Sequence, residues 1–398
     1  MSTDAPRAPA GLILPSYQRP AGVHPPLDTP AAARAWLDAE RASLVAVSAH
    51  AARRGWPSHA SRLAVTLYRY LDTGGYFSEA VTVHNAGRRA ARRVGDRGAI
   101  AEALNSLGHA DLRQGHYQQA IGRFQKAHAN FRAIGHKPGE ASALRNLGIA
   151  ATQQGDYQQA ARHLELAAVL FRQTGDQAGR ARVLGNLGIL AMQQGRYQQA
   201  VDYQQQALII FRAVGDQSGE AHGLRSLGTI NGRQGSYESA ADYFRQALSL
   251  FRAVGDRAGQ AHALTDLGDV DLRRGHFDSA ARHQLRSLTL FHETGDLAGQ
   301  AKALNALGSA LLSVGRVADA HARHIEALAL ARKLGDSREQ ARAYNGLGRA
   351  EHALGDLGEA RRQWRQALAL YTRIGTPEAD QIRSQLAKMT DLPAKSRS

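Results

Sequence analysis

The chain has 398 residues, of which 43% are hydrophobic and 21% charged, and its formal net charge is +15. This is the composition of a globular protein with ample chain for a large buried core. The absence of cysteine excludes disulfides and thiolate-ligated metal or iron–sulfur centres. No run of about 18 apolar residues occurs, so we expect no transmembrane helix. The N-terminus lacks the basic and apolar regions of a secretory signal, and we therefore expect a cytoplasmic protein.

Prolines mark the N-terminal boundary. Seven of the eleven prolines lie within residues 1–30, so a Pro-rich flexible arm is predicted over residues 1–27. A helix is predicted over residues 28–55, with Thr29 as N-cap and Pro30 at the first helical position. Gly55 stands 40 residues before Gly95. The helix therefore has the register of a half-repeat and is expected to cap the repeats that follow.

A 40-residue period governs residues 56–375, where a Leu-Gly pair, two further glycines and an alanine recur at fixed positions. In the copy over residues 176–215, Asp176 is suited to N-cap a first helix, and Gly195 to end it in a left-handed conformation. Gly215 ends a second helix. Such a hairpin buries its apolar stripe only by stacking on the next copy, so about eight stacked hairpins are predicted. A capping helix is expected over residues 376–390 and a disordered tail over residues 391–398.

Two aromatic ladders accompany the second helix of each hairpin. The first consists of Phe77, Tyr117, Tyr157, Tyr197, Tyr237 and Phe277, and the second of Phe131, Phe171, Phe211, Phe251 and Phe291. Both follow the apolar register. We predict that both form the core between repeats rather than stacking platforms for nucleobases.

The pattern resembles the tetratricopeptide repeat, whose small and apolar positions match, in order, Leu107, Gly108, Ala120, Phe124 and Ala127. The usual unit has about 34 residues, so this chain is similar to a lengthened, 40-residue variety. The resemblance implies an all-α fold, a right-handed superhelical solenoid of about eight helix–turn–helix repeats with capping helices. Residues 28–100 also look like the segment before the C-terminal repeat arrays of bacterial STAND-type and antibiotic-regulatory regulators. That likeness implies a free-standing or truncated relative of such a regulator.

Motifs for catalysis are absent from the sequence. It contains no phosphate-binding loop, no HExxH and no GxSxG motif, so we expect no enzymatic activity and no cofactor. The seventeen histidines are interpreted as solvated or packed side chains, because no carboxylate joins them at a metal-ligand spacing. No metal site is therefore expected.

In the family that the pattern resembles, the first helix of each hairpin lines a concave groove. Carried over by register, the candidate ligand-binding residues are Asn105, His109, Arg113, Arg145, Asn146, Gln153, Asn186, Gln193, Arg225, Arg233, Asp269, Arg273, Asn305, Asn345 and Arg349. Arginines outnumber the single acid, Asp269, which favours an acidic segment as ligand. The asparagine amides are suited to hold a peptide backbone, since each offers a donor and an acceptor.

These observations predict a non-catalytic, regulatory scaffold that binds an extended or helical segment of a protein or peptide in the groove. Two alternatives stay open. One is a basic nucleic-acid-binding solenoid driven by the net charge. The other is an accessory subunit of an enzyme or of a STAND-type regulator. A monomer without membrane attachment is expected, because both ends carry caps.

Overall fold

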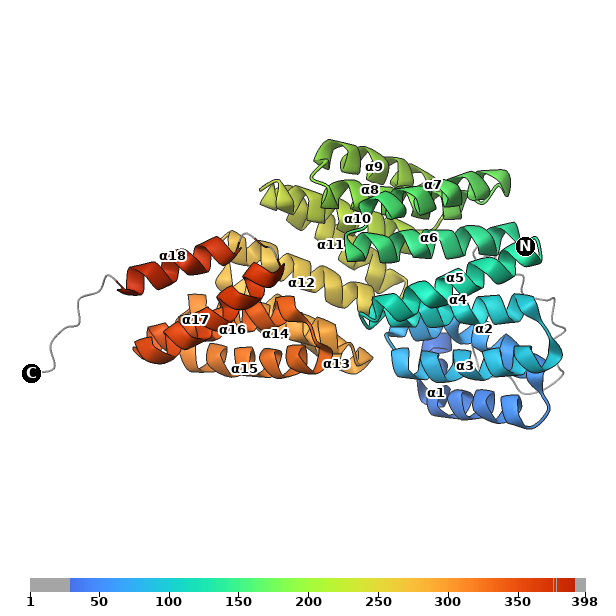
Figure 1. Ribbon diagram of the computed structural model, residues 1–398, viewed down its shortest axis with the longest axis horizontal. Coiled ribbons are helices and arrows are strands. Elements are labelled where there is room, and N and C mark those ends of the chain that lie inside the picture. Colours follow the sequence, from blue (N-terminus) through green and yellow to red (C-terminus); the bar gives the residue numbers. More distant parts are fainter. Residues whose placement is uncertain (1–28, 375, 377, 391–398) are drawn as a thin grey trace, which may run out of the picture. The chain divides into compact units, whose positions relative to one another are not determined.

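The structure is a computed structural model, and it describes residues 29–374, 376 and 378–390. Within this part of the chain there are eighteen α-helices and no strand (Figure 1). The predicted arm 1–27, the tail 391–398 and Gly375 lie outside the described residues. None of the described helices is both long and apolar enough to cross a lipid bilayer.

Two single helices begin and end the described chain, α1 (Pro30–Arg53) and α18 (Glu378–Thr390). The others alternate between the first and second helix of a hairpin, here called A and B helices. The A helices are α2 (Pro57–Gly74), α4 (Arg97–Arg113), α6 (Lys137–Gln154), α8 (Gln177–Gln193), α10 (Gln217–Arg233), α12 (Arg257–Arg273), α14 (Leu297–Ser313) and α16 (Ser337–Leu354). The B helices are α3 (Phe77–Val94), α5 (Tyr117–Ala133), α7 (Tyr157–Gln173), α9 (Tyr197–Val214), α11 (Tyr237–Ala253), α13 (Phe277–Thr294), α15 (Val317–Leu334) and α17 (Leu357–Ile374).

The predicted helix ends are confirmed. Oδ1 of Asp176 accepts a hydrogen bond from the backbone N–H of Gly179 at 2.8 Å and so caps α8. Gly195, just after α8, has φ 75°, and Gly215, which ends α9, has φ 70°. A side chain would be strained at such angles, which is why the period keeps glycine there. Thr29 caps α1, its Oγ1 accepting from the N–H of Ala32 at 3.1 Å.

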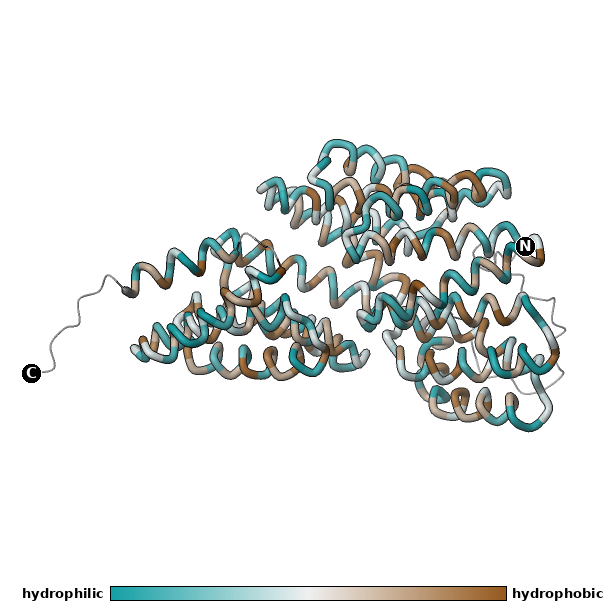
Figure 2. The backbone as a smooth tube through the Cα atoms, in the orientation of Figure 1, coloured by the Kyte–Doolittle hydropathy of each residue, from teal (hydrophilic) through white to brown (hydrophobic). Residues whose placement is uncertain are grey.

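The second aromatic ladder forms the core between hairpins, as predicted: its five phenylalanines are at most 4% exposed. Each lies against a glycine in the next A helix. A Cβ built on Gly179 would stand 2.4 Å from the ring of Phe171, so this glycine lets the two helices approach closely. Figure 2 shows the resulting alternation of hydrophobic and hydrophilic stretches along the helices.

The prediction for the first aromatic ladder was largely wrong. Only Phe77 is buried, at 7% exposed. Tyr117 is 36% exposed, and the other four rings are half-buried. These rings stand at the first residue of a B helix, beside the turn that joins it to its A helix.

The chain divides into two compact units, one ending at Gly259 and the other beginning at Gln260. The border lies inside α12, where the sequence predicted one continuous array. Within unit 1, α2, α4, α6, α8 and α10 contact one another in series, and α3, α5, α7 and α9 each pack between their own A helix and the next. In unit 2, α14 and α16 make the same contact. Within unit 1 the A helices α2 to α10 therefore form one layer.

Candidate functional site

The first and last elements of unit 1 meet. Nη1 of Arg34, near the start of α1, donates to the carbonyl oxygen of Gly255 at 2.8 Å, in the turn between α11 and α12. One helical turn further, Oδ1 of Asp38 accepts from the hydroxyls of Tyr70 at 2.8 Å and Tyr76 at 2.9 Å. These bonds fix α1 on the first hairpin. The A helices of unit 1 are thus arranged around a common interior.

That interior holds a cavity of about 380 Å³, within the size range of small-ligand sites. All five A helices of unit 1 contribute to its wall. The polar and charged residues that line it are Ser61, Tyr68, Arg69, Asp72, Thr73, His84, Glu102, Asn105, Ser106, His109, Ser142, Arg145, Asn146, Asp176, Arg182, Asp216, Ser218 and His222.

Arg145, on α6, is a cation without a carboxylate partner among the described residues. Its Nη2 donates to Oδ1 of Asn146 at 3.2 Å, and Nδ2 of Asn146 donates to Oδ1 of Asn105 at 3.0 Å. Its Nε is buried and makes no hydrogen bond within the described chain. Burial, followed by the charge of Arg182, lowers the pKa of Arg145 to about 10. The guanidinium therefore has unused capacity for an anion.

Glu102, on α4, is the opposite case. It forms no hydrogen bond or ion pair with the described residues, and burial alone raises the pKa of its carboxyl to about 7. The corresponding position in the later A helices is polar throughout, holding Ser142, Arg182, His222, His262, Lys302 and Arg342. Glu102 is therefore the one acid at a position that is otherwise neutral or basic from α4 to α16.

Asp72 and His109 form an ion pair between α2 and α4, with 3.1 Å between Oδ1 and Nδ1. Burial disfavours the charged carboxylate, but the charge and hydrogen bond of His109 outweigh this effect and lower the pKa of Asp72 to about 2. The ring of Tyr68 lies between His109 and the buried His84, with centroid distances of 6.2 and 6.0 Å. Burial lowers the pKa of His84 to about 4, so this imidazole is neutral at pH 7.

A further pair of charges lines the cavity. Nη2 of Arg182, on α8, lies 2.5 Å from Oδ2 of Asp216, the residue that caps α10. His222, on α10, lies 3.8 Å from Asp256, but burial, followed by the charges of Arg225 and Arg113, lowers its pKa to about 4, so this imidazole is neutral at pH 7. The cavity thus combines ion pairs with two half-buried groups, Glu102 and Arg145, that have no ion-pair partner among the described residues.

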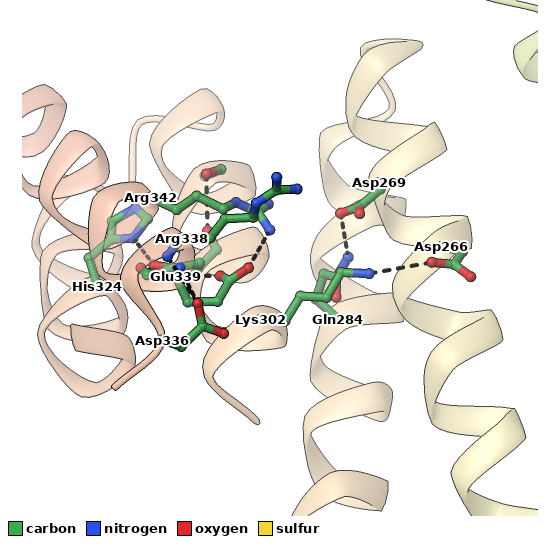
Figure 3. Close-up of polar contacts among 11 residues, drawn as sticks. Asp266, Asp269, Gln284, Lys302, His324, Asp336, Arg338, Glu339 and Arg342 are labelled. Atoms are coloured by element: carbon green, nitrogen blue, oxygen red, sulfur yellow. Dashed lines mark hydrogen bonds and ion pairs between the residues drawn. The ribbon is translucent and has the colours of Figure 1, made fainter. Parts of the chain in front are cut away.

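Unit 2 uses the same face of its A helices differently. Nδ2 of the buried Asn305 donates to Oε2 of Glu339 at 2.9 Å, and Nη1 of Arg342 donates to Oε1 at 3.1 Å. Nδ1 of His324 lies 3.2 Å from Oδ1 of Asn305. Figure 3 shows this cluster and, on the neighbouring helices, Lys302 beside Asp266 and Gln284 beside Asp269. Most of these polar side chains therefore form hydrogen bonds or ion pairs within the protein.

A tetratricopeptide repeat family model matches residues 99–173, 179–253, 221–293 and 299–373, which make up more than half of the chain. The chain belongs to the tetratricopeptide repeat family. No curated protein sequence matches it.

Several solved structures share the fold of this tetratricopeptide repeat protein. A STAND protein with a tetratricopeptide repeat sensor from Pyrococcus horikoshii matches with a TM-score of 0.57 and 15% identity, over 90% of this chain and 54% of that one. The apo quorum sensor NprR from B. thuringiensis matches with a TM-score of 0.55 and 15% identity, over 85% and 98%. A Rap protein complexed with Competence and Sporulation Factor gives 0.53 and 13%, over 84% and 97%. At these identities the likeness concerns the fold.

Four of the residues predicted for the groove of the tetratricopeptide array line the cavity together: Asn105, His109, Arg145 and Asn146. Two more lie close to it. The guanidinium of Arg113 stands 5.5 Å from the ring centre of Phe77, and the charge of Arg225 contributes to lowering the pKa of His222, after burial. Gln153, Gln193 and Arg233 are exposed near the ends of their A helices, and Asn186 is half-buried on α8.

The remaining predicted residues, Asp269, Arg273, Asn305, Asn345 and Arg349, belong to unit 2. Asn305 is 1% exposed, so its amide is not available to a ligand, and we leave it out of the candidate site. Oδ1 of Asn345 accepts from the indole of Trp364 at 3.1 Å. Asp269 accepts from Gln284 at 3.3 Å. Arg273 and Arg349 are exposed.

Sequence reasoning missed Tyr68, Asp72, Glu102, Arg182 and His222. Two signals in the sequence could have found some of them. Asp72 interrupts a position that holds leucine in three later repeats, at Leu112, Leu272 and Leu312. Glu102, Arg182 and His222 share one polar position, which stands between two small or apolar residues in each repeat.

Proposed function

We propose that this protein is a non-catalytic binding scaffold whose unit 1 cavity receives a segment of a peptide or protein partner. The observation that carries the proposal is the cavity, which gathers amide, guanidinium and carboxylate groups from five A helices in one interior. Concave, largely preformed sites with a few convergent polar groups are typical of ligand binding. Because the helices are already ordered, most of the entropy lost on binding is lost by the ligand.

The structural relatives support a regulatory role within this proposal. One relative carries its tetratricopeptide repeats as a sensor, one is a quorum sensor, and one is complexed with a factor for competence and sporulation. By analogy we propose that occupancy of the cavity is the signal that this chain passes on, either as a free-standing protein or beside a larger regulator. A cytoplasmic monomer remains our expectation for its state in the cell.

The test is capture of a partner by the immobilised full chain from extract of the source cells, with and without nuclease. The cavity variant is Arg145→Ala with His222→Ala. The matched control is Arg132→Ala with Arg172→Ala, two exposed positions on the outer B helices. We expect a partner that the wild type and the control retain and the cavity variant loses, and whose synthetic peptides compete for binding.

Equal retention of that partner by both double variants would contradict the cavity as its site. Recovery of mainly nucleic acid, released by moderate salt and insensitive to both double variants, would support the electrostatic alternative. Each variant is first compared with the wild type by circular dichroism and thermal melting, so that loss of folding is separated from loss of binding.

A further inference from the structure

Two unpaired charges of opposite sign share the cavity without neutralising each other. Arg145 feels Arg182, Tyr68 and Asp176, while the carboxyl of Glu102 is influenced by burial alone. Both groups nevertheless act on the same phenol, because Glu102 and Arg145 each contribute to the environment of Tyr68. Both groups line the same cavity, Glu102 from α4 and Arg145 from α6, and they form no ion pair with each other.

We infer that the cavity binds a dipolar ligand, with an ammonium group held by Glu102 and a carboxylate held by Arg145. The inference rests on the proposed function and specifies the chemistry of the segment that enters. Free peptide termini and the side chains of lysine and an acidic residue both supply this chemistry.

Glu102 and Arg145 cost free energy as long as they have no partner of opposite charge. A charged group taken from water without a partner loses its hydration and gains nothing in return. In the same cavity, Asp72 pairs with His109 and Arg182 pairs with Asp216. Glu102 and Arg145 depart from that pattern together. A ligand that brings both missing charges would relieve both costs in one binding event.

The surroundings of Arg145 favour a carboxylate at this point. Asn146 is 2% exposed and bonded on both sides, to Arg145 and to Asn105. This chain of bonds holds the guanidinium in place before a ligand arrives, and preorganisation of this kind raises affinity. The cavity of about 380 Å³ lies near the lower end of the usual range for ligand sites. It accommodates a short peptide end or one charged segment rather than a folded domain.

The test is equilibrium dialysis of the full chain against defined tripeptide pools, read out by mass spectrometry. One pool has uncharged side chains and free termini, and matched pools carry an N-acetyl group, a C-terminal amide or both. A further pool is blocked at both ends and contains one lysine and one glutamate. We expect the wild type to retain a dipolar pool at least about tenfold over the doubly blocked, uncharged pool, the effect of a charge-assisted hydrogen bond.

The variants separate the two contacts. Glu102→Gln should erase the discrimination against N-acetylation, or against loss of lysine, while keeping the preference for a carboxylate. Arg145→Gln should do the reverse. The matched controls Glu165→Gln and Arg172→Gln, at exposed positions of α7, should change neither. Because each variant must keep one preference, an unfolded protein cannot imitate the expected result.

Retention of the free-termini pool assigns the ligand charges to peptide termini, and retention of the blocked lysine–glutamate pool assigns them to side chains. The inference is overturned if the wild type retains no dipolar pool, or if both folded variants keep the wild-type preferences. Neither of these results would contradict the proposed function. Capture of a partner that the Arg145→Ala, His222→Ala variant loses does not require a dipolar segment.

Discussion

Arg145 in unit 1 and Arg342 in unit 2 show how one fold gives the same type of residue two different roles. Both lie on A helices. Burial disfavours the charge of Arg342, but Glu339 and then Asp269 outweigh it, so the pKa of Arg342 is raised. The charge of Asp176 also acts on Arg145, but burial and the charge of Arg182 outweigh it, and the pKa of Arg145 is lowered to about 10. Arg342 is thus paired within the protein, whereas Arg145 keeps a buried guanidinium nitrogen without a hydrogen-bond partner among the described residues.

The difference arises from the residues around each arginine rather than from the backbone. Asn305 contacts Glu339 and His324 and is buried, whereas Asn105, at the same position of its repeat, is half-buried and lines the cavity. In a repeat protein the backbone is nearly the same in every repeat. A binding surface therefore differs from a structural one in whether its polar groups form hydrogen bonds within the protein.

The largest expected effect comes from removing one buried ring from the core of each unit, which tests whether the two cores are equivalent. Phe131→Ala in unit 1 and Phe291→Ala in unit 2 each remove a ring that is at most 1% exposed. Each should lower the free energy of unfolding by about 3–5 kcal/mol, because the cavity left behind cannot be filled. Urea unfolding combined with hydrogen exchange measures both. A loss in one variant but not the other would show that the units differ in their cores as well as in their grooves.

A second pair of variants compares the two asparagines directly. Asn305→Ala should cost about 1–3 kcal/mol, because it leaves buried groups of Glu339 and His324 without a partner. Asn105→Ala should cost at most about 1 kcal/mol, since water can enter the cavity and bond to Asn146. Urea unfolding of both variants at pH 7.5 measures the difference. Equal losses would contradict the contrast between a satisfied and an open polar surface.

His324 provides a test by pH. Burial, followed by the charges of Arg349, Arg342 and His321, lowers the pKa of His324 to about 3. The unfolded chain therefore takes up this proton first, and the stability from His324 is lost as the pH falls from about 6.5 towards 3. His324→Gln should flatten this dependence. Gln284 occupies the same position and donates to the carbonyl of Thr265 at 3.0 Å, so glutamine fits. Thermal melts at pH 7.5 and 5 would show an unchanged slope if the prediction is wrong.

Glu102 should give the smallest effect, with the opposite sign. Burial raises the pKa of Glu102 to about 7, so the folded chain binds the proton more tightly and stability falls as the pH rises from about 4.5 through 7. Glu102→Gln should therefore raise Tm at pH 8 by roughly 2–4 °C per kcal/mol regained, and leave it nearly unchanged at pH 4.5. The exposed Glu165→Gln serves as control. A variant that melts below the wild type at pH 8 would show that Glu102 has a partner.

Local features of the fold were predictable from the sequence, because they depend on residues close together in the chain. Asp176, Gly195 and the second phenylalanine ladder each follow from capping, left-handed turns or helical periodicity. We predicted that the first aromatic ladder, which includes Tyr117, is buried because helical periodicity shows on which face of the helix a ring lies. Periodicity does not show how much of the ring the neighbouring residues cover. Apart from Phe77, the rings at the first residue of a B helix are half-buried or exposed.

The candidate site was predictable only in part. Register predicted Asn105, His109, Arg145 and Asn146 as groove residues, and these four line the cavity. Whether such a residue is open to a ligand or hydrogen-bonded within the protein depends on the facing B helix, as the contact between His324 and Asn305 shows. The meeting of α1 with the turn after α11 joins residues 221 positions apart, and no local pattern specifies it. Glu102 was overlooked because the candidate groove residues were taken from other positions of the repeat.

The bond between Arg34 and Gly255 also bears on how this protein can evolve. Repeat arrays commonly change length by duplication or loss of a whole unit, since each repeat contacts only its neighbours. In unit 1 an added or deleted copy would shift the position of Gly255 relative to Arg34 and separate the walls of the cavity. A change in the number of copies up to Gly259 would therefore alter the cavity, whereas a substitution at a single position such as Glu102 would change its lining and leave the Arg34–Gly255 bond in place.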